Sequence, residues 1–370
     1  MPRRTRKASS SIRKTRKRVP QSKPGVKWPH GSIVYICGAS PVKFGPLDKD
    51  LGGSEQAVVQ LSKCWAATGR PVVVYGNVKE GQHAGVDYRS IRELNLADKF
   101  DTAIFWRSYG VRLLPLVEAV NRIVDLHDSW DPKEYVSSRQ LLEKADKIMV
   151  KSKYHRSLYK YIPDSKIRTV MNGVQVDLFN KIIEKVPDTD REPHRFIYAS
   201  SYERGLEPIL RYTWPKIKKA YPDATFDIYY GMNRLMKTPL GIKLRSLFKQ
   251  PGVKEHGRVS LERIAEEKAK STFHLYVSNA VTEIDCISVR ESLLCGSIPI
   301  LGNDYVFRER DGIHIPGSTS SSLTYKRAGS TVVNLMKDPV AISRKRDELR
   351  KSDTIISWDE VAKEWLKVMN

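Results

Sequence analysis

The sequence has few cysteines and no long apolar run. Its 370 residues include four cysteines, and no two of these form a C-x-x-C pair. This pattern disfavours a structural zinc site and a secreted fold held by disulfides, and it favours the reducing cytoplasm. The longest apolar stretches, such as residues 32–37 and 71–75, have the length of a strand. They fall well short of the roughly 18 residues that a membrane-spanning helix needs.

Sequence motifs of several common enzyme classes are also absent. The chain contains no H-E-x-x-H, no G-x-S-x-G and no G-x-x-x-x-G-K-[ST], and G-x-G-x-x-G is missing after the first predicted strand. These absences disfavour a zinc protease, a serine hydrolase of the common type, a P-loop nucleotide hydrolase and a dehydrogenase.

The first 23 residues lack acidic side chains and contain ten Lys or Arg, so they carry +10 of the formal net charge of +22. With so few apolar residues to bury, residues 1–29 are predicted to be a disordered tail. Such a tail suits binding to nucleic acid, a nuclear address or a peripheral position on an anionic membrane surface. A cleaved transit peptide and a plain solubilising arm stay open as alternatives.

The remaining residues are enough for two domains, since 40% of the chain is hydrophobic and a domain takes roughly 150 residues. After residue 29, short β-branched runs alternate with helical patterns, which is typical of an α/β fold with parallel sheets. Strands are expected at residues 32–38, 71–76, 102–106, 122–126, 147–151, 196–200, 225–230, 272–277 and 298–301. Helices are expected at 54–68, 206–220, 260–270 and 287–295, the second of them with a break at Pro215.

This pattern predicts two doubly wound, Rossmann-like domains. The first spans residues 30–180 and the second 195–345, with a polar linker at 181–194 and a C-terminal segment at 346–370. Parallel sheets bind ligands at the carboxyl ends of their strands. A cleft between the two domains is therefore the expected site.

Two glutamates give the most informative spacing in the chain. Glu283 precedes a predicted helix and Glu291 follows eight residues later, which is roughly 12 Å along a helix. That distance suits an extended sugar, diphosphate and ribose. Glu283 is then expected at the sugar and Glu291 at the ribose hydroxyls, with the helix start facing the diphosphate, although an ordinary acidic helix face has the same spacing.

Two strand-to-helix turns contain groups that suit an anion. Gly52 and Gly53 precede the first helix, where free N–H groups and close backbone approach favour a phosphate. Ser200, Ser201 and Arg204 follow the first strand of the second domain and add two hydroxyls and a guanidinium. A tight turn and a solvated arginine are the plainer interpretations.

His127 follows the predicted strand 122–126 and is thereby placed at the carboxyl edge of the first sheet. A single histidine is more often structural than catalytic. Its position at the expected cleft makes it a candidate catalytic group.

Taken together, these segments resemble the family 4 glycosyltransferases, which are retaining enzymes of the GT-B fold that use nucleotide-sugar donors. The resemblance extends from about residue 32 to the end of the chain. It is carried by residues 52–55, 145–152, 172–179, 257–260, 283–299 and 358–365, the last of which is similar to the family's terminal helix that crosses back to the first domain.

The resemblance implies roles for individual residues. The family's Glu-x7-Glu motif falls on Glu283, at the donor sugar, and Glu291, at the ribose. Backbone N–H groups at Ile287 and Ser288 would meet the diphosphate, which Gly53 would approach from the other domain. His127 matches the histidine near the transferred sugar.

The chain departs from the family pattern in three places. The family usually has an Arg and a Lys on the diphosphate, whereas here Arg204 stands at the Lys position and Ser200 or Ser201 at that of the Arg. Asp285 replaces a common aromatic residue and adds a negative charge near the phosphates. Cys286 matches a known variant of the motif's glycine.

The expected activity is transfer of a hexose from a nucleoside diphosphate-sugar to an acceptor hydroxyl, with retention, no metal and no cofactor beyond the donor itself. The acceptor would be a glycan, a glycolipid or a glycoprotein glycan. Arg89, Arg92, Arg107 and Arg112 suit an anionic acceptor or a solvated surface. A glycan phosphorylase, a nucleotide-sugar epimerase and a nucleic-acid-binding or structural protein with an inactive body remain as alternatives.

Overall fold

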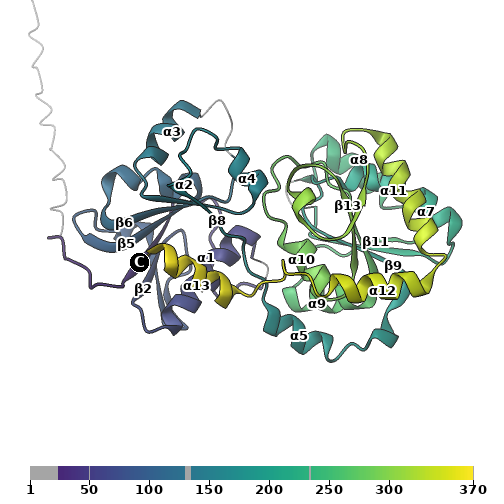
Figure 1. Ribbon diagram of the computed structural model, residues 1–370, viewed down its shortest axis with the longest axis horizontal. Coiled ribbons are helices and arrows are strands. Elements are labelled where there is room, and N and C mark those ends of the chain that lie inside the picture. Colours follow the sequence, from purple (N-terminus) through teal and green to yellow (C-terminus); the bar gives the residue numbers. More distant parts are fainter. Residues whose placement is uncertain (1–23, 50, 130–134, 233–234, 370) are drawn as a thin grey trace, which may run out of the picture.

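The computed structural model describes residues 24–49, 51–129, 135–232 and 235–369, which form two α/β domains side by side (Figure 1). Within these residues the first domain contains an eight-stranded sheet in the order β3-β4-β2-β1-β5-β6-β7-β8, parallel except for β3. Its strands are β1 (Ile33–Gly38), β2 (Val72–Gly76), β3 (Gly81–His83), β4 (Val86–Ser90), β5 (Lys99–Trp106), β6 (Glu118–Asp125), β7 (Lys147–Val150) and β8 (Ile167–Thr169). Its helices are α1 (Gly53–Ala67), α2 (Arg107–Val111), α3 (Tyr135–Glu143) and α4 (Lys153–Ser157).

The second domain contains a parallel six-stranded sheet in the order β11-β10-β9-β12-β13-β14 within the described ranges. Its strands are β9 (Glu192–Ala199), β10 (Thr225–Tyr229), β11 (Val253–Glu255), β12 (Ser271–Tyr276), β13 (Ile298–Gly302) and β14 (Ile313–Ile315). The helices after β8 are α5 (Val176–Ile183), α6 (Leu206–Pro208), α7 (Trp214–Ala220), α8 (Pro239–Leu247), α9 (Leu261–Lys270), α10 (Ile287–Leu294), α11 (Ser322–Leu335), α12 (Pro339–Leu349) and α13 (Trp358–Met369).

The central strands form because their apolar residues are covered on both faces of each sheet. Every residue of β1, β2, β12 and β13 is buried, as expected for parallel strands with helices on either side. The predicted α/β fold with two doubly wound domains is confirmed.

Each sheet has a point where the strand order reverses, and this fixes where a ligand can enter. The chain runs from β1 to β2 on one side and returns to β5 on the other, and it does the same from β9 to β10 and back to β12. Crevices in doubly wound sheets open at the carboxyl ends of such strand pairs. The two crevices lie at the ends of β1 and β5 and of β9 and β12.

The helix expected at residues 206–220 is interrupted, but not at Pro215. Residues Ile209–Thr213 form a π-helical turn between α6 and α7, and Pro215 lies in the first turn of α7. Proline lacks an N–H group, so the first turn of a helix tolerates it and the widened turn precedes it.

Residues 24–29, which the sequence assigns to the tail, pack on the first domain. Trp28 donates from Nε1 to Asp98 (3.0 Å), and its ring centre lies 5.1 Å from that of Phe100. Lys27 pairs with Lys99 of β5 as a parallel bridge. Residues 1–23, where the predictions of disorder and of an electrostatic partner fall, lie outside the described residues.

The chain passes between the domains twice, and the two passages lie together. Val174 and Ser357 form a parallel bridge. The stretch predicted as the linker, residues 181–194, contains the end of α5, a 3₁₀ turn η4 (Asp188–Asp190) and the start of β9. Figure 1 shows the yellow C-terminal segment leaving α12 of the second domain and returning as α13 to the first.

Helix α13 belongs to the hydrophobic core of the first domain. Its Trp365 is fully buried and its ring centre lies 5.6 Å from that of Trp65 in α1. Trp65 donates from Nε1 to the carbonyl of Ala362 at 3.3 Å. The second passage therefore ends in a well-packed anchor.

Among the described residues, no helix combines the length and the apolar character needed to cross a bilayer.

We predict that Trp365→Ala destabilises the protein by about 3–5 kcal/mol, because it removes a large buried ring from the contact between α13 and α1. Lys363→Ala, at an exposed position of the same helix, is the control and should change the free energy of unfolding by less than about 0.5 kcal/mol. Urea unfolding followed by tryptophan fluorescence measures both. Equal effects of the two variants would show that α13 does not anchor the second passage.

Candidate active site

A cleft of about 1220 Å³ lies between the domains, at the carboxyl ends of the central strands of both sheets. Residues from each domain line it, among them every residue that the sequence predicts for the site: Gly52, Gly53, His127, Ser200, Ser201, Arg204, Glu283, Ile287, Ser288 and Glu291. The fold therefore brings together side chains that are far apart in the sequence. Their chemical roles stay predictions.

The start of α10 is shaped by Glu283. Its Oε1 accepts hydrogen bonds from the backbone N–H groups of Cys286 (3.0 Å) and Asp285 (3.4 Å). The chain then turns through the left-handed region at Cys286 (φ 61°) and enters α10. Within the described residues no hydrogen bond engages the N–H groups of Ile287 and Ser288, which belong to the unpaired first turn of the helix.

The glycine-rich start of α1 faces the start of α10 across the cleft. A Cβ atom at Gly53 would lie 3.3 Å from Cδ1 of Ile287. Gly52 is the N-cap of α1 and has no side chain to bond the helix start. Two helix N-termini, each with partial positive charge, thus converge on the same space.

The loop after β9 places Arg204 at the cleft. It ends at Gly205, which has φ 92° and packs so tightly that a Cβ atom would lie 2.6 Å from the carbonyl oxygen of Val277. Arg204 forms an ion pair with Glu283, and this carboxylate raises the pKa of Arg204. The residue predicted to contact the diphosphate, Arg204, is therefore paired with the residue predicted to contact the sugar, Glu283.

The two serines of this loop differ in their surroundings. Ser200 is buried and shares a hydrogen bond of 2.9 Å with the hydroxyl of Tyr276 in β12. Ser201 is more exposed, and its hydroxyl lies 3.5 Å from a carboxylate oxygen of Glu203. Ser201 is therefore the freer of the two as a donor.

Glu291 is held by a lysine that the sequence analysis did not single out. Lys268 of α9 is fully buried and donates to Glu291 Oε2 (2.7 Å) and to the carbonyl of Ser288 (2.8 Å). Glu291 Oε1 has no hydrogen-bond partner among the described residues and remains available to a ligand. Lys268 lies in a helix rich in alternating charges, so nothing in the local sequence separates it from its solvated neighbours.

His127 belongs to a buried polar cluster. Its Nε2 lies 2.9 Å from Asp125, which also accepts from Lys151 and from the hydroxyl of Tyr35. Burial alone would raise the pKa of Asp125, but His127 and Lys151 lower it below its usual range. Burial lowers the pKa of His127 itself. The histidine is thus neutral near pH 7, with Nε2 protonated toward Asp125 and Nδ1 left as an acceptor.

The negative charge of Asp285 is compensated. Asp285 is buried and pairs with Arg290 (2.7 Å) and Arg310 (3.0 Å), and it accepts from the backbone N–H of Asn172 (3.3 Å). Two guanidiniums therefore surround the carboxylate that departs from the family pattern. The same contacts tie the segment before α10 to the first passage between the domains.

Arg107 is a further cleft residue. Of the four arginines that the sequence marks on the acceptor side, it alone lines this cleft among the described residues. It has φ 53°, a strained conformation for arginine. Its guanidinium makes two bonds to Asp128 (2.6 and 2.7 Å) and lies 3.7 Å from Glu55. The signal for it in the sequence is its place directly after the expected strand 102–106.

In the described part of the chain, no three His, Cys, Asp or Glu side chains are grouped so that they could hold a metal ion. The metal independence of the reaction stays a prediction.

Comparison with solved structures identifies the architecture. The structure of HepE from Anabaena in complex with UDP and glucose is similar over 92% of this chain and 99% of that chain, with a TM-score of 0.65 and 11% identity. The structure of sucrose-phosphate synthase from Thermosynechococcus elongatus is similar over 91% of this chain and 98% of that chain, with a TM-score of 0.66 and 12% identity. The fold is GT-B.

A further solved structure is similar at a comparable TM-score and sequence identity. The N-terminal domain of trehalose-6-phosphate phosphatase from Candida albicans is similar with a TM-score of 0.66 at 11% identity, over 92% of this chain and 97% of that one. No family model matches the sequence, and no curated protein matches it either. Identities this low show a shared fold.

We predict that glycine is a more stable replacement than alanine at Cys286, the reverse of the usual order within a helix. A left-handed conformation costs a non-glycine residue about 1–2 kcal/mol, so Cys286→Gly should be more stable than Cys286→Ala by about 1 kcal/mol in urea unfolding. Cys295 is the matched control, because it is also buried and has φ −73° at the end of the same helix. There the alanine variant should be the more stable one. If the alanine variant were the more stable one at both positions, the left-handed conformation of Cys286 would not be a source of strain.

Proposed function

We propose that this protein is a retaining glycosyltransferase that transfers a hexose from a nucleoside diphosphate-sugar to an acceptor hydroxyl without a metal ion. The observation that carries the proposal is the meeting of two helix starts from different domains, those of α1 and α10, at Gly53 and Ile287. Helix N-termini bind phosphate groups. A diphosphate between them would contact both domains at once.

The negative charge that develops on the departing diphosphate is the main chemical difficulty of the reaction. The N–H groups of Ile287 and Ser288 and the guanidinium of Arg204 would stabilise it from positions that are fixed before the donor binds. Such preorganised groups usually supply the largest single contribution to catalysis. Arg204 would share its charge between the phosphate and Glu283.

The remaining predicted residues suit the two ends of the donor. The free Oε1 of Glu291, held in place by Lys268, would accept from the ribose hydroxyls. Glu283 and His127, which both line the cleft, would lie at the sugar end, where the neutral imidazole would offer Nδ1 as an acceptor for a sugar hydroxyl.

The proposed reaction takes place on one face of the sugar. The bond between the anomeric carbon and the diphosphate oxygen breaks, and the acceptor oxygen bonds to the same face. The acceptor proton passes to the departing phosphate, so no strong protein base is required. A cleft of about 1220 Å³ exceeds the roughly 300–1,000 Å³ of a single small-molecule site and has room for a donor and part of a glycan or lipid-linked acceptor.

The choice of first donor follows from the neighbours. HepE was solved with UDP and with UDP-glucose. UDP and UDP-glucose are therefore the first probes for this protein, followed by the GDP and ADP analogues.

The test is turnover of a nucleotide-sugar by variants of the cleft. We predict that Arg204→Ala lowers kcat/KM by about 100-fold, as expected for the loss of one charge-stabilising donor. Arg211→Ala, an exposed arginine shortly after the same loop, should leave it within about twofold. Urea unfolding of both variants checks that each is folded. Unchanged turnover in folded Arg204→Ala would contradict the proposed role.

A ligand series separates the ribose contact from general damage to the fold. Wild-type protein should bind 2′,3′-dideoxy-UDP at least about tenfold more weakly than UDP, which corresponds to roughly 1.4 kcal/mol. Glu291→Ala, which leaves no acceptor at this position, should bind the two ligands nearly equally. A variant that still prefers UDP would show that Glu291 does not contact the ribose.

The alternatives give different results in the same assays. A glycan phosphorylase would release sugar phosphate from a glycan without any nucleotide. A nucleic-acid-binding protein with an inactive body would show no nucleotide-sugar binding, together with steeply salt-dependent binding of nucleic acid that is lost when residues 1–23 are deleted.

A further inference from the structure

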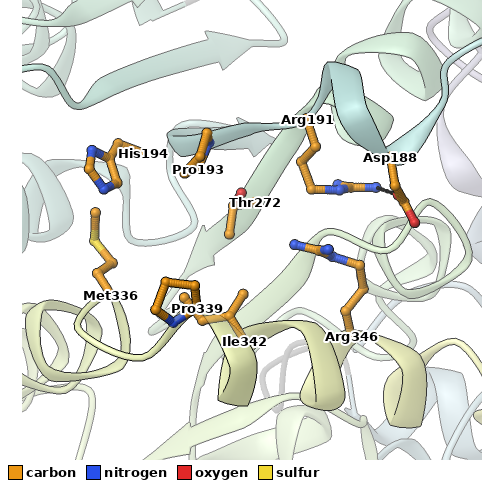
Figure 2. Close-up of a pocket in the computed structure, with 9 residues that line it drawn as sticks. All are labelled: Asp188, Arg191, Pro193, His194, Thr272, Met336, Pro339, Ile342 and Arg346. Atoms are coloured by element: carbon orange, nitrogen blue, oxygen red, sulfur yellow. Dashed lines mark hydrogen bonds and ion pairs between the residues drawn. The ribbon is translucent and has the colours of Figure 1, made fainter.

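A second hollow lies at the amino ends of strands β9 and β12 in the second sheet, whereas the cleft lies at the carboxyl ends. It has a volume of about 230 Å³ and is formed by the starts of β9 and β12, the turn η4 and helix α12. Figure 2 shows the residues that line it: Asp188, Arg191, Pro193, His194, Thr272, Met336, Pro339, Ile342 and Arg346.

This hollow is separate from the cleft. The cleft lies at the carboxyl ends of the strands, whereas Thr272 and Pro193 lie at their amino ends. β12 has six residues, so the two ends of the sheet are roughly 20 Å apart. A small molecule in the hollow would not touch a donor in the cleft.

One side of the hollow is strongly basic. Arg191 and Arg346 both line it, and Arg350 lies beside them and makes two bonds to Asp188 (2.8 and 2.9 Å). Asp188 also pairs with Arg191 (3.1 Å). Asp188 thus lies among three guanidiniums, and Asp347 of α12 also acts on Arg346 and Arg350. Three positive charges against two negative ones leave an excess of positive charge.

Arg191 is held in the protein with part of its hydrogen-bonding capacity unused. It is only 8% exposed, and it donates to the carbonyls of Ser271 (2.6 Å) and Cys295 (2.8 Å). Its terminal nitrogens also bond to the carbonyl of Lys268 (3.4 Å) and to Asp188 (3.1 Å), and its buried Nε has no partner among the described residues. Burial and the nearby Arg346 lower the pKa of Arg191 to about 10. Asp188 compensates this charge only in part, because it is shared with Arg350.

Arg346 offers donors toward the hollow. Its Nε bonds to the carbonyl of Gly296 (3.1 Å), and its terminal nitrogens have no hydrogen-bond partner among the described residues. In Figure 2 its guanidinium extends from α12 toward Arg191 and Thr272. A planar guanidinium with two free terminal NH₂ groups suits two oxygens of one anion.

The other side of the hollow is mainly apolar. Pro193, Met336, Pro339 and Ile342 form it, and His194, which pairs with Asp223, closes the far end. The volume is below the roughly 300–1,000 Å³ of typical ligand pockets. The occupant is therefore small, with an anionic group at one end and a short, less polar body.

We propose that this hollow binds a small organic oxyanion, a molecule with one phosphate or carboxylate group, through hydrogen bonds from Arg346 and the nearby positive charge of Arg191. The bound anion reduces the repulsion between the two guanidiniums. It also joins η4 to α12, two segments that are more than 140 residues apart in the sequence. The site is independent of the proposed glycosyl transfer.

The test uses inorganic phosphate and glycerol 3-phosphate, measured by calorimetry and thermal shift at constant ionic strength with chloride. Wild-type protein should bind both and gain thermal stability by mass action. Arg346→Gln should weaken binding at least about tenfold. Arg344→Gln, an exposed neighbour on the same helix, should leave it within about twofold.

One more variant and a competing ligand locate the anion. Ile342→Glu places a carboxylate in the hollow and should also abolish binding. Excess UDP, which the proposed function places in the cleft and which is too large for a hollow of about 230 Å³, should leave the affinity for phosphate within about twofold. Wild-type affinity in Arg346→Gln and Ile342→Glu would overturn the proposal. Loss of phosphate binding in the presence of UDP would overturn it as well, because the anion would then lie in the cleft.

Discussion

The conformation of the chain just before α10 is the constraint on which the rest of the candidate site depends. Glu283 accepts two backbone hydrogen bonds and forces the turn through Cys286, so the first N–H groups of the helix are directed to the cleft. The same carboxylate pairs with Arg204 from the loop after β9. One glutamate therefore sets both the helix start and the position of the nearest guanidinium.

The second requirement is that the two domains keep a fixed relation around this point. Asp285, with Arg290 and Arg310, ties the segment before α10 to the first passage between the domains. The second passage ends in α13, where the ring centre of Trp365 lies 5.4 Å from Nζ of Lys151. Trp365 therefore packs on the polar cluster that holds His127. Buried charged groups in both places have partners, which is what makes their burial tolerable.

Much of this arrangement is encoded locally and could be predicted from the sequence. The buried strands are continuous apolar runs, and the turns at their carboxyl ends contain the glycines, serines and charged residues of the cleft, so all predicted site residues meet there. Lys268 and the pairing of Arg204 with Glu283 could not be predicted, because they depend on contacts between segments far apart in the chain. The short strands β3, β8, β11 and β14 could not be predicted either, since three-residue strands carry almost no periodic signal. The five-residue strand β4 is also absent from the sequence expectation, although its apolar and polar residues alternate.

The most direct measurement is a crystal structure of the protein with UDP. The account predicts phosphate oxygens about 3 Å from the N–H groups of Ile287 or Ser288 and from the guanidinium of Arg204, with the ribose at Glu291. A nucleotide bound with its phosphates away from the start of α10, or outside the cleft, would contradict it.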